Sequence, residues 1–586
     1  MNSFVKTMFA CLVAIMVAGF VLPIVWIVFF VGFAVSAGSN DNGIKENSVL
    51  FIELDGMLEE RSDANPLASF MGNDYKVRGL DDIIASIKTA AKDDDIKGIY
   101  LQAGAMQVAS LASLEEMRGE LAAFKESGKF IVAYADQYSQ ELYYLSTIAD
   151  MVAINPYGTL SWHGFASQPI FYKDLLEKVG VEMQIFKVGT YKSAVEPFIA
   201  TKMSDADREQ VAELLNSSWR DMTSAVSESR SIPVDKLNEY ADRFMDFRQA
   251  QEYIDCGLVD TLLYKDGMLA CLKQLTNVGE GDKLSLVTPE EMNEYPQITG
   301  EGSGKIAVYY AFGEIDSSTS TDEGINSQKV IKELRELRED SSVNAVVLRV
   351  NSPGGSAYGS EQIWREVMLL KAAKPVVVSM GDYAASGGYY ISCAADCIVA
   401  NSTTLTGSIG IFGMFPSAEK LLKDKLGLNF DVVKTNRMAD FGAYSRPFNA
   451  DECDVLQEYV ENGYALFLKR CADGRGMSVD DIGRIAEGRV WTGRKAKELG
   501  LVDEIGDLDK AVEVAAKLAG VEGYSVESYP GAADFITKLM DSDKDDYMKS
   551  VLKSSFGDLY DVAEFMRGVY GCDPLQARMP FELNIK

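Results

Sequence analysis

Histidine is almost missing from this chain of 586 residues, which contains only His163. A Ser-His-Asp triad would have to use that residue. Its counterpart in the internal repeat described below is the apolar Ile409. We therefore expect His163 to be structural, and acid–base chemistry to use lysine or a carboxylate instead.

Positive charge is also scarce. Lysine and arginine total 57 against 87 aspartates and glutamates, a net charge of −30. Binding to nucleic acid needs clustered cations that neutralise phosphates. The composition therefore predicts no nucleic-acid partner, and its acidity favours solubility.

The eight cysteines are scattered and form no Cys-x-x-Cys pair. That spacing gives little support to a zinc site or a thioredoxin-like redox site. Cys393 and Cys397 are four residues apart, which on a helix would place both thiols on one face, where we expect apolar packing. We predict no metal and no organic cofactor.

One long apolar run is present, near the amino terminus, and no second run of that length follows. No charged residue lies between Thr7 and Asn40. A helix needs ~20 apolar residues to cross a bilayer, so residues 8–37 are predicted to be a transmembrane anchor. The alternative is a cleaved signal peptide ending near Ala37, but such apolar regions are only ~7 to 15 residues long. Lys6 in the short end, residues 1–7, places that end in the cytoplasm and the bulk of the chain outside it.

The rest of the chain contains the same pattern twice. Residues 143–150 (YYLSTIAD) are echoed by residues 389–396 (YYISCAAD), and each copy ends on Gly-Leu-Val-Asp, at 257–260 and 500–503. Strand-like apolar segments begin near residues 48, 96 and 130 in the first copy and near 345 and 376 in the second, and residues 80–92 have helical apolar spacing. In both copies strand-like segments alternate with helix-like ones, which predicts βαβ units, a mainly parallel covered sheet and an α/β fold. The predicted division is a first domain at 48–294, a linker at 295–303, a second domain at 304–530 and a tail at 531–586.

The two copies differ where polar chemistry would lie. The second copy reads Ala-Ser-Gly-Gly at 385–388, where the first has Ser-Gln-Glu-Leu at 139–142. Small residues around Ser386 predict an exposed serine at a tight turn, with the amides of the following helix facing it. The first copy instead has Lys192, and the matching segment at 441–448 has no lysine. A serine in one copy and a lysine in the other predict one site divided between them.

A second glycine-rich corner, Pro353-Gly354-Gly355, follows a strand-like segment at 345–350. Adjacent glycines at a strand end allow amides to point at a bound oxygen, as an oxyanion hole requires. Taken alone, the same letters equally describe an ordinary turn.

These motifs together, with the segments at 189–194 (GTYKSA) and 406–410 (TGSIG), resemble the signal peptide peptidase A family, also called protease IV, in its long duplicated form. The resemblance covers nearly all of the chain after the anchor. It implies two tandem Clp/crotonase-like domains, Ser386 as nucleophile, Lys192 as general base, and the Gly354 and Gly355 amides as oxyanion donors. Ser408 is implied, more weakly, to orient Lys192.

The resemblance also implies an activity and a place in the cell. The expected protein is a single-pass serine endopeptidase of the bacterial cytoplasmic (inner) membrane, with its bulk in the periplasm and residues 8–37 in the lipid bilayer. Its expected substrates are remnant signal peptides and other unfolded or membrane-released peptides. It is expected to form a homo-oligomer, with a tetramer favoured. Two alternatives stay open: a crotonase-like acyl-CoA enzyme and a non-catalytic membrane scaffold.

The proposed base must be neutral to accept a proton. A free lysine has a pKa of ~10.4, so bringing it to ~7 to 8 needs burial in an environment that disfavours the ammonium. Glu196 would oppose that change if it faced Lys192, and we expect it to point elsewhere. Ser417 and Lys420 form a rival Ser-x-x-Lys pair, but Ser417 follows Pro416 and is predicted to cap a helix instead.

Overall fold

The computed structural model describes residues 44–62, 77–108, 110–293, 304–316, 324–531 and 575–579. The predicted anchor at 8–37 and linker at 295–303 lie outside these ranges. Within the described residues, no helix combines the length and apolarity needed to cross a bilayer. Of the predicted tail, Gly531 and residues 575–579 are described.

The first repeat is built on a parallel sheet with the strand order β8-β6-β5-β4-β1-β9. Its strands are β1 (Ser48–Leu54), β4 (Ile96–Ala103), β5 (Phe130–Tyr138), β6 (Met151–Leu160), β8 (Thr261–Leu262) and β9 (Leu286–Val287). Helices α4 (Leu80–Lys92) and α5 (Leu111–Lys125) connect the first strands. Apolar residues of α4 recur at helical spacing, and Leu80, Ile83, Ile87 and Ala90 are buried.

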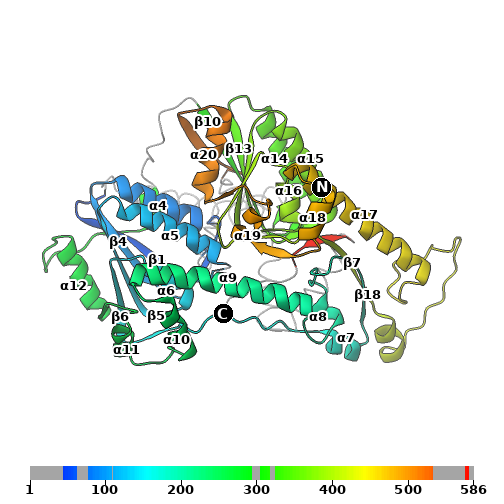
Figure 1. Ribbon diagram of the computed structural model, residues 1–586, viewed down its shortest axis with the longest axis horizontal. Helices are drawn as coiled ribbons and strands as arrows, with labels where there is room; N and C mark the ends of the chain where they lie inside the picture. Colours follow the sequence, from blue (N-terminus) through cyan, green and yellow to red (C-terminus); the bar gives the residue numbers. More distant parts are fainter. Residues whose placement is uncertain are drawn as a thin grey trace, which may run out of the picture.

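The second repeat has the same central order. Its sheet runs β19-β17-β15-β13-β10-β21, and β16 pairs with β15. The strands are β10 (Gly304–Phe312), β13 (Ala345–Ser352), β15 (Val376–Ala385), β16 (Cys397–Ala400), β17 (Leu405–Gly407), β19 (Val490–Thr492) and β21 (Tyr524–Tyr529). The series β10-β13-β15-β16 corresponds to β1-β4-β5-β6, so the predicted duplication of a parallel α/β unit is confirmed. Figure 1 shows the two sheets as separate bodies.

Side-chain contacts repeat along with the strands. The Tyr143 hydroxyl donates to the Leu258 carbonyl at 2.7 Å, and the Tyr389 hydroxyl donates to the Leu501 carbonyl at 2.9 Å. These are equivalent positions of the two sequence echoes. Each tyrosine thus ties the end of its repeat back to the helix after the third strand.

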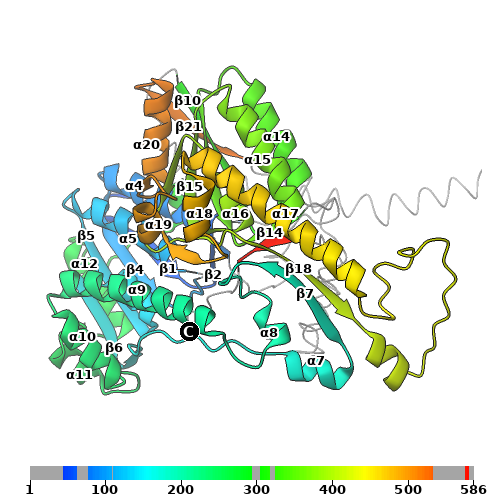
Figure 2. The same cartoon turned by 45° about the vertical axis from the view of Figure 1, so that its right-hand side comes forward.

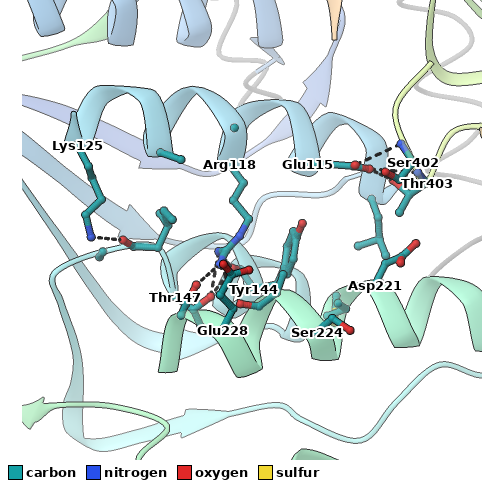
Figure 3. A pocket seen from close by; sticks show the side chains of 18 of the residues that line it. Glu115, Arg118, Lys125, Tyr144, Thr147, Asp221, Ser224, Glu228, Ser402 and Thr403 are labelled. Carbon is teal, nitrogen blue, oxygen red and sulfur yellow. Dashed lines mark hydrogen bonds between the residues drawn. The ribbon is translucent and has the colours of Figure 1, made fainter. Parts of the chain in front are cut away.

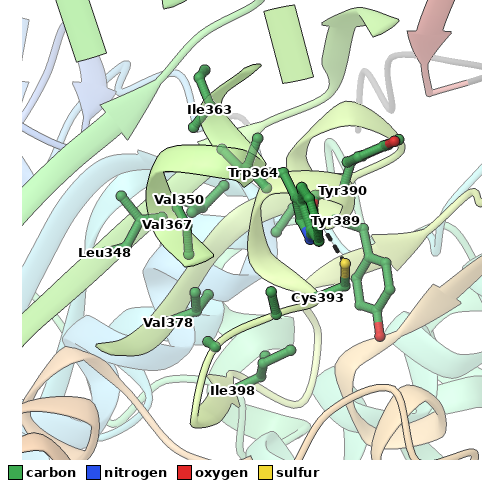
Figure 4. Packing of buried hydrophobic residues seen from close by; sticks show 14 of the residues in the cluster. Leu348, Val350, Ile363, Trp364, Val367, Val378, Tyr389, Tyr390, Cys393 and Ile398 are labelled. Carbon is green, nitrogen blue, oxygen red and sulfur yellow. Dashed lines mark hydrogen bonds between the residues drawn. The ribbon is translucent and has the colours of Figure 1, made fainter. Parts of the chain in front are cut away.

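Both faces of the second sheet are covered, which explains its continuous apolar strands. Val346, Leu348 and Val350 point into the larger core cluster, whereas Ala345 and Val347 point into the cluster under α20 (Leu508–Ala519). On the first of these faces lie α15 (Ala357–Lys371) and α16 (Gly387–Ser392), and Figure 4 shows Trp364, Tyr389 and Tyr390 from them in this core.

The third sheet joins the two repeats. Strand β7 (Glu182–Val188) of the first repeat pairs antiparallel with β18 (Ile411–Ser417) of the second, from Val188 opposite Ile411 to Glu182 opposite Ser417. The full order is β12-β11-β14-β22-β18-β7, with β11 (Ile315–Asp316), β12 (Ile325–Asn326), β14 (Gly354–Ser356) and β22 (Gln576–Arg578). Figure 2 shows β7 and β18 side by side, well away from the first repeat's own sheet. The segment after β7, which carries Lys192, is thereby delivered to the second repeat.

Buried ion pairs also hold the repeats together. Arg349 on β13 is 1% exposed, and its guanidinium donates to Glu60 at 2.9 and 3.1 Å and to Glu116 at 2.8 Å, both in the first repeat. These carboxylates hold the pKa of Arg349 well above its ordinary value, despite the opposing effect of burial. Asp382 on β15 accepts hydrogen bonds from the Ser113 amide and hydroxyl, both at 2.9 Å.

A further contact between the repeats borders a pocket. Glu115 on α5 accepts hydrogen bonds from the amides of Ser402 and Thr403 and from the Thr403 hydroxyl at 2.7 Å (Figure 3). The pocket lies between α5 and α9 (Asp205–Arg230), and neither Lys192 nor Ser386 lines it. It is therefore not part of the site predicted from the sequence.

Candidate active site

Ser386 lies at the turn between β15 and α16 with φ 56° and ψ −110°. A positive φ is strained for a residue with a Cβ, and such strain is typical of serines presented at a sharp strand-to-helix turn. The turn is held by the Ser386 amide, which donates to the Gly407 carbonyl at 2.8 Å. Ser386 is fully buried in the described structure, so the tight turn is confirmed but the predicted exposure of the serine is wrong.

The glycines after Ser386 are required by close backbone packing. A Cβ on Gly387 would lie 2.7 Å from the Ser360 hydroxyl oxygen, and a Cβ on Gly388 would lie 2.6 Å from the Ser352 carbonyl oxygen. The start of α16 can therefore approach the Ser352–Gly355 corner only without side chains. This is the physical reason for the Ser-Gly-Gly sequence of the second copy.

Lys192 reaches this turn from the other repeat. Its Nζ lies 2.8 Å from the Ser386 Oγ, 3.0 Å from the Ser408 Oγ and 3.1 Å from the Ser408 carbonyl oxygen. All of these residues belong to one chain, so the divided site predicted from the sequence comes together within a single polypeptide. Ser408, the residue with the weakest sequence support, contacts Lys192 through two atoms.

The environment of Lys192 disfavours its charged form. The side chain is fully buried, and burial lowers the pKa of Lys192 well below its ordinary value. Two glycines of the second repeat press against it: a Cβ on Gly488 would lie 2.7 Å from the Lys192 Cβ, and one on Gly410 would lie 3.3 Å from its Cδ. Glu196 points elsewhere, as predicted, and accepts a hydrogen bond from the Ser204 amide.

The first repeat fills the equivalent place with a glutamine. The Gln140 side chain accepts from the amides of His163 and Gly164 and donates to the Gly164 carbonyl at 3.3 Å. In the second repeat, the Ser386 hydroxyl faces the equivalent carbonyl, that of Gly410, at 3.5 Å. Gln140 thus bonds in one copy the carbonyl whose equivalent faces Ser386 in the other.

Peptidase family S49 matches this chain twice, over residues 123–279 and 368–522. Protease 4 of Haemophilus influenzae is 36% identical over 536 residues, which cover 87% of this chain and 85% of that protein. The chloroplastic serine protease SPPA of Arabidopsis thaliana is 30% identical over 507 residues, or 85% of this chain and 73% of that protein.

The chain belongs to peptidase family S49.

It is therefore a serine peptidase, a hydrolase, as the sequence predicted, and one of the two family matches lies within each α/β repeat. Among solved structures, a mutant of ClpP1 from Listeria monocytogenes matches with 16% identity and a TM-score of 0.24, over 35% of this chain and 94% of that chain. A superposition this loose does not test the Clp-like part of the predicted fold class.

Other residues of the peptidase singled out in the sequence lie apart from the Ser386–Lys192 contact. His163 pairs with Asp246, 3.2 Å away, in the first repeat. Lys420 is exposed and pairs with Glu182. The prediction that Ser417 caps a helix is wrong: it is the last residue of β18, because pairing with β7 keeps the backbone extended to that point.

The apolar packing predicted for Cys393 and Cys397 is confirmed. Both are buried in apolar clusters, as expected. They do not share a helix, however, because α16 ends at Ser392 and Cys397 begins β16. Their thiols consequently belong to different faces of the sheet.

Sequence reasoning missed the residues that hold the lysine segment. Gln210 on α9 is 1% exposed and donates to the Tyr191 carbonyl and the Ser193 hydroxyl, both at 3.1 Å, while its own oxygen accepts from the Val490 amide on β19. Ser193 in turn donates to Asp207 at 2.5 Å. Gln210 therefore bonds both neighbours of Lys192 and the second repeat at once. No local motif marks it, since a glutamine on a long polar helix is ordinary.

Proposed function

We propose that this S49 peptidase hydrolyses peptide bonds with a Ser-Lys dyad, in which Ser386 is the nucleophile and Lys192 the general base. The observation that carries the proposal is the 2.8 Å approach of the Lys192 Nζ to the Ser386 Oγ in a fully buried environment. Proton transfer requires this distance, and burial keeps the amine neutral enough to accept the proton.

The surroundings of the amine favour the correct orientation. A neutral lysine amine has two hydrogens and one lone pair. The Ser408 carbonyl can only accept, and the Ser408 Oγ can accept the second hydrogen. The lone pair is then left for the Ser386 hydroxyl. Ser408 thereby acts as a positioning residue for Lys192.

The reaction follows the acyl-enzyme route. The Ser386 Oγ attacks the peptide carbonyl carbon while its proton passes to the Lys192 Nζ, and Lys192 then gives that proton to the leaving amine. Water attacks the resulting ester carbonyl while Lys192 takes one of its protons, and Lys192 returns that proton to the Ser386 Oγ as the ester C–O bond breaks and the acid product leaves. We assign stabilisation of the negative charge that develops on the carbonyl oxygen to the amides of the Gly354–Gly355 corner. The Gly354 amide donates to the Ser352 hydroxyl at 3.2 Å and would exchange that partner for the oxyanion.

We extend the proposal to substrate and location. The substrates are remnant signal peptides and other unfolded or membrane-released peptides, and residues 8–37 anchor the chain in the bacterial inner membrane with the repeats outside the cytoplasm. The printed name of a relative from Enterococcus faecium, a putative signal peptide peptidase SppA that is 36% identical over 203 residues, supports this substrate class. We also propose the domain limits 48–294 and 304–530 and a homo-oligomer, preferably a tetramer, that encloses the active sites.

Peptide hydrolysis by purified variants tests the dyad. Ser386→Ala and Lys192→Ala should each lower kcat/KM by at least about a thousandfold, because the members of such a dyad act as one unit. Ser417→Ala and Lys420→Ala remove the rival pair and serve as matched controls with unchanged kcat/KM. Full activity in either dyad variant rejects the assignment of Ser386 and Lys192. A large loss of kcat/KM in the Ser417→Ala or Lys420→Ala variant would instead favour the rival pair.

A further inference from the structure

The EGR segment, the three residues directly before β19, joins two parts of the site. The Tyr191 amide, next to Lys192, donates to the Glu487 carbonyl at 2.9 Å. The Ser408 amide donates to the Arg489 carbonyl at 2.7 Å. The backbone that carries Lys192 and the serine that contacts its Nζ are therefore fixed to the same three residues.

The backbone around this segment is tightly packed and strained. A Cβ on Gly189 would lie 2.5 Å from the Glu487 carbonyl oxygen, so the lysine segment and the EGR segment touch through backbone atoms. Glu487 and Ser408 have φ values of 54° and 49°, and Ser386 shares this left-handed conformation. Such values are unfavourable for residues with a Cβ and persist only where the surrounding contacts fix them. The site therefore depends on contacts that hold the EGR segment in place.

The Arg489 side chain ties the EGR segment to the first repeat. Its guanidinium lies over the rings of Tyr191 and Trp491, 4.6 and 4.5 Å from their centroids, which is a favourable cation–π arrangement. It also donates to the Tyr191 hydroxyl at 3.1 Å. Two carboxylates of α9 accept from the same group, Glu209 at 3.0 Å and Glu213 at 2.6 Å. A planar guanidinium can hold all of these partners in fixed directions.

The ionic contacts of Arg489 add little to the stability of the fold. The Glu209 and Glu213 side chains are 58% and 45% exposed. Ion pairs with exposed carboxylates contribute little to folding, because water and salt screen them. Their position beside the lysine segment gives them a different importance, since a small displacement of a reacting group lowers the rate strongly.

We propose that Arg489 is a positioning residue for the peptidase reaction, which keeps the Lys192 amine aligned with the Ser386 hydroxyl. It acts at two points, through its side chain on Tyr191 and through its carbonyl on Ser408. The inference rests on the proposed function, since it takes the dyad as given. Arg489 takes no part in the bond-making steps and acts only through the residues that hold the base.

The test uses the full chain with Arg489→Met, which keeps a long apolar side chain and removes the guanidinium. The kcat for an unstructured peptide should fall about tenfold to a hundredfold with little change in KM, because a base displaced by about 1 Å can cost a hundredfold in rate. The Tm should stay within about 4 °C of the parent, since the exposed ion pairs contribute little. A loss confined to KM, or a Tm loss large enough to unfold the chain at the assay temperature, would overturn the inference.

Two further variants sharpen this test. Arg494 on α19 (Gly493–Glu498) also pairs with α9, through Asp221 at 2.9 Å, so Arg494→Met is the matched control and should keep the kcat of the parent. Tyr191→Leu removes the ring and hydroxyl that the Arg489 guanidinium contacts. Combined with Arg489→Met, it should lower kcat no further than the slower single variant does, because both changes break the same contact. Fully additive losses would contradict the inference.

Titration of Lys192 separates this inference from the dyad assignment. In a Ser386→Ala background, lysines labelled with 13C at Cε report their own protonation by NMR, and the Lys192 signal is the one missing from Lys192→Arg. Arg489→Met should raise the pKa of Lys192 toward its ordinary value by at least about one pH unit, because a loosened amine gains water. Parent activity in Ser386→Ala would reject the dyad. An inactive Ser386→Ala, together with a parent kcat or a parent Lys192 pKa in Arg489→Met, would reject only the role of Arg489.

Discussion

Replacement of Arg349 by methionine should uncouple the two repeats. The guanidinium is nearly inaccessible and neutralises Glu60 and Glu116, which are themselves 6% exposed. Without it, two buried carboxylates lose the cation that neutralises them. Removing one partner of a buried ionic cluster costs about 3 to 5 kcal/mol, mainly because the remaining charges stay desolvated.

That loss is large enough to measure by heating. For domains of 150 to 250 residues, 1 kcal/mol changes Tm by about 2 to 4 °C, so Arg349→Met should lower the first unfolding transition by about 6 to 20 °C. Differential scanning calorimetry at pH 7.5 is the assay. Peptidase activity should be lost at the same midpoint temperature, because Lys192 belongs to the first repeat and Ser386 to the second.

A compensated variant gives the control. In the triple variant Arg349→Met with Glu60→Gln and Glu116→Gln, no charge is left buried, and most of the lost stability should return. The reasoning is refuted if Arg349→Met melts within about 2 °C of the parent, which corresponds to a loss of no more than about 1 kcal/mol. So would a triple variant that melts no higher than the single one, since the cost would then come from packing and not from charge.

Three further predictions concern the lysine, a buried aspartate and Gln210. The kcat/KM of the parent should rise with pH as Lys192 loses its proton, at a pH well below the ordinary lysine pKa, whereas Lys192→Arg should be inactive across the whole pH–rate profile because a guanidinium keeps its proton. Burial raises the pKa of Asp382 from 3.8 to about 6, so protonated Asp382 stabilises the fold by about 3 kcal/mol at low pH, and this stabilisation is lost as pH rises from about 4 to 6. In urea unfolding, the free energy of unfolding of Asp382→Asn should therefore exceed that of the parent at pH 7.5 but not at pH 4. An equal gain at both pH values would contradict this. Gln210→Ala leaves the Tyr191 carbonyl and the Val490 amide without this partner and should lower kcat about tenfold to a hundredfold with little change in KM, whereas an effect on KM alone would show that Gln210 acts on peptide binding.

Local sequence patterns predicted most of the repeated architecture. The helix expected at Leu80–Lys92 has those bounds, and the strands expected near 48, 96, 130, 345 and 376 are all present. Each of these segments has its own apolar periodicity, so no distant partner is needed to recognise it. The failure falls where a distant partner decides: Ser417 stays extended, and does not cap a helix, because β7 pairs with it.

The site was predictable for a different reason. Comparison of the two copies singled out Ser386 and Lys192, because at each of these positions the other copy has a different residue. The structure brings the Lys192 Nζ to 2.8 Å from the Ser386 Oγ. The same comparison aligned Gln140 with Ser386. Gln140 donates to the Gly164 carbonyl, as the Ser386 hydroxyl faces the equivalent Gly410 carbonyl. Gln210 has no such counterpart. Its role comes from packing between segments far apart in the chain, which a linear pattern does not record.

The pairing of β7 with β18 has a consequence for how this protein is made. A ribosome completes Lys192 long before Ser386, which lies 194 residues further along the chain. The lysine segment then has no strand to join until residues 411–417 have emerged and folded. With the proposed dyad divided in this way, a nascent or truncated chain that lacks the second repeat is expected to have no peptidase activity. The late pairing of β7 with β18 would then delay proteolysis until the second repeat has folded and docked.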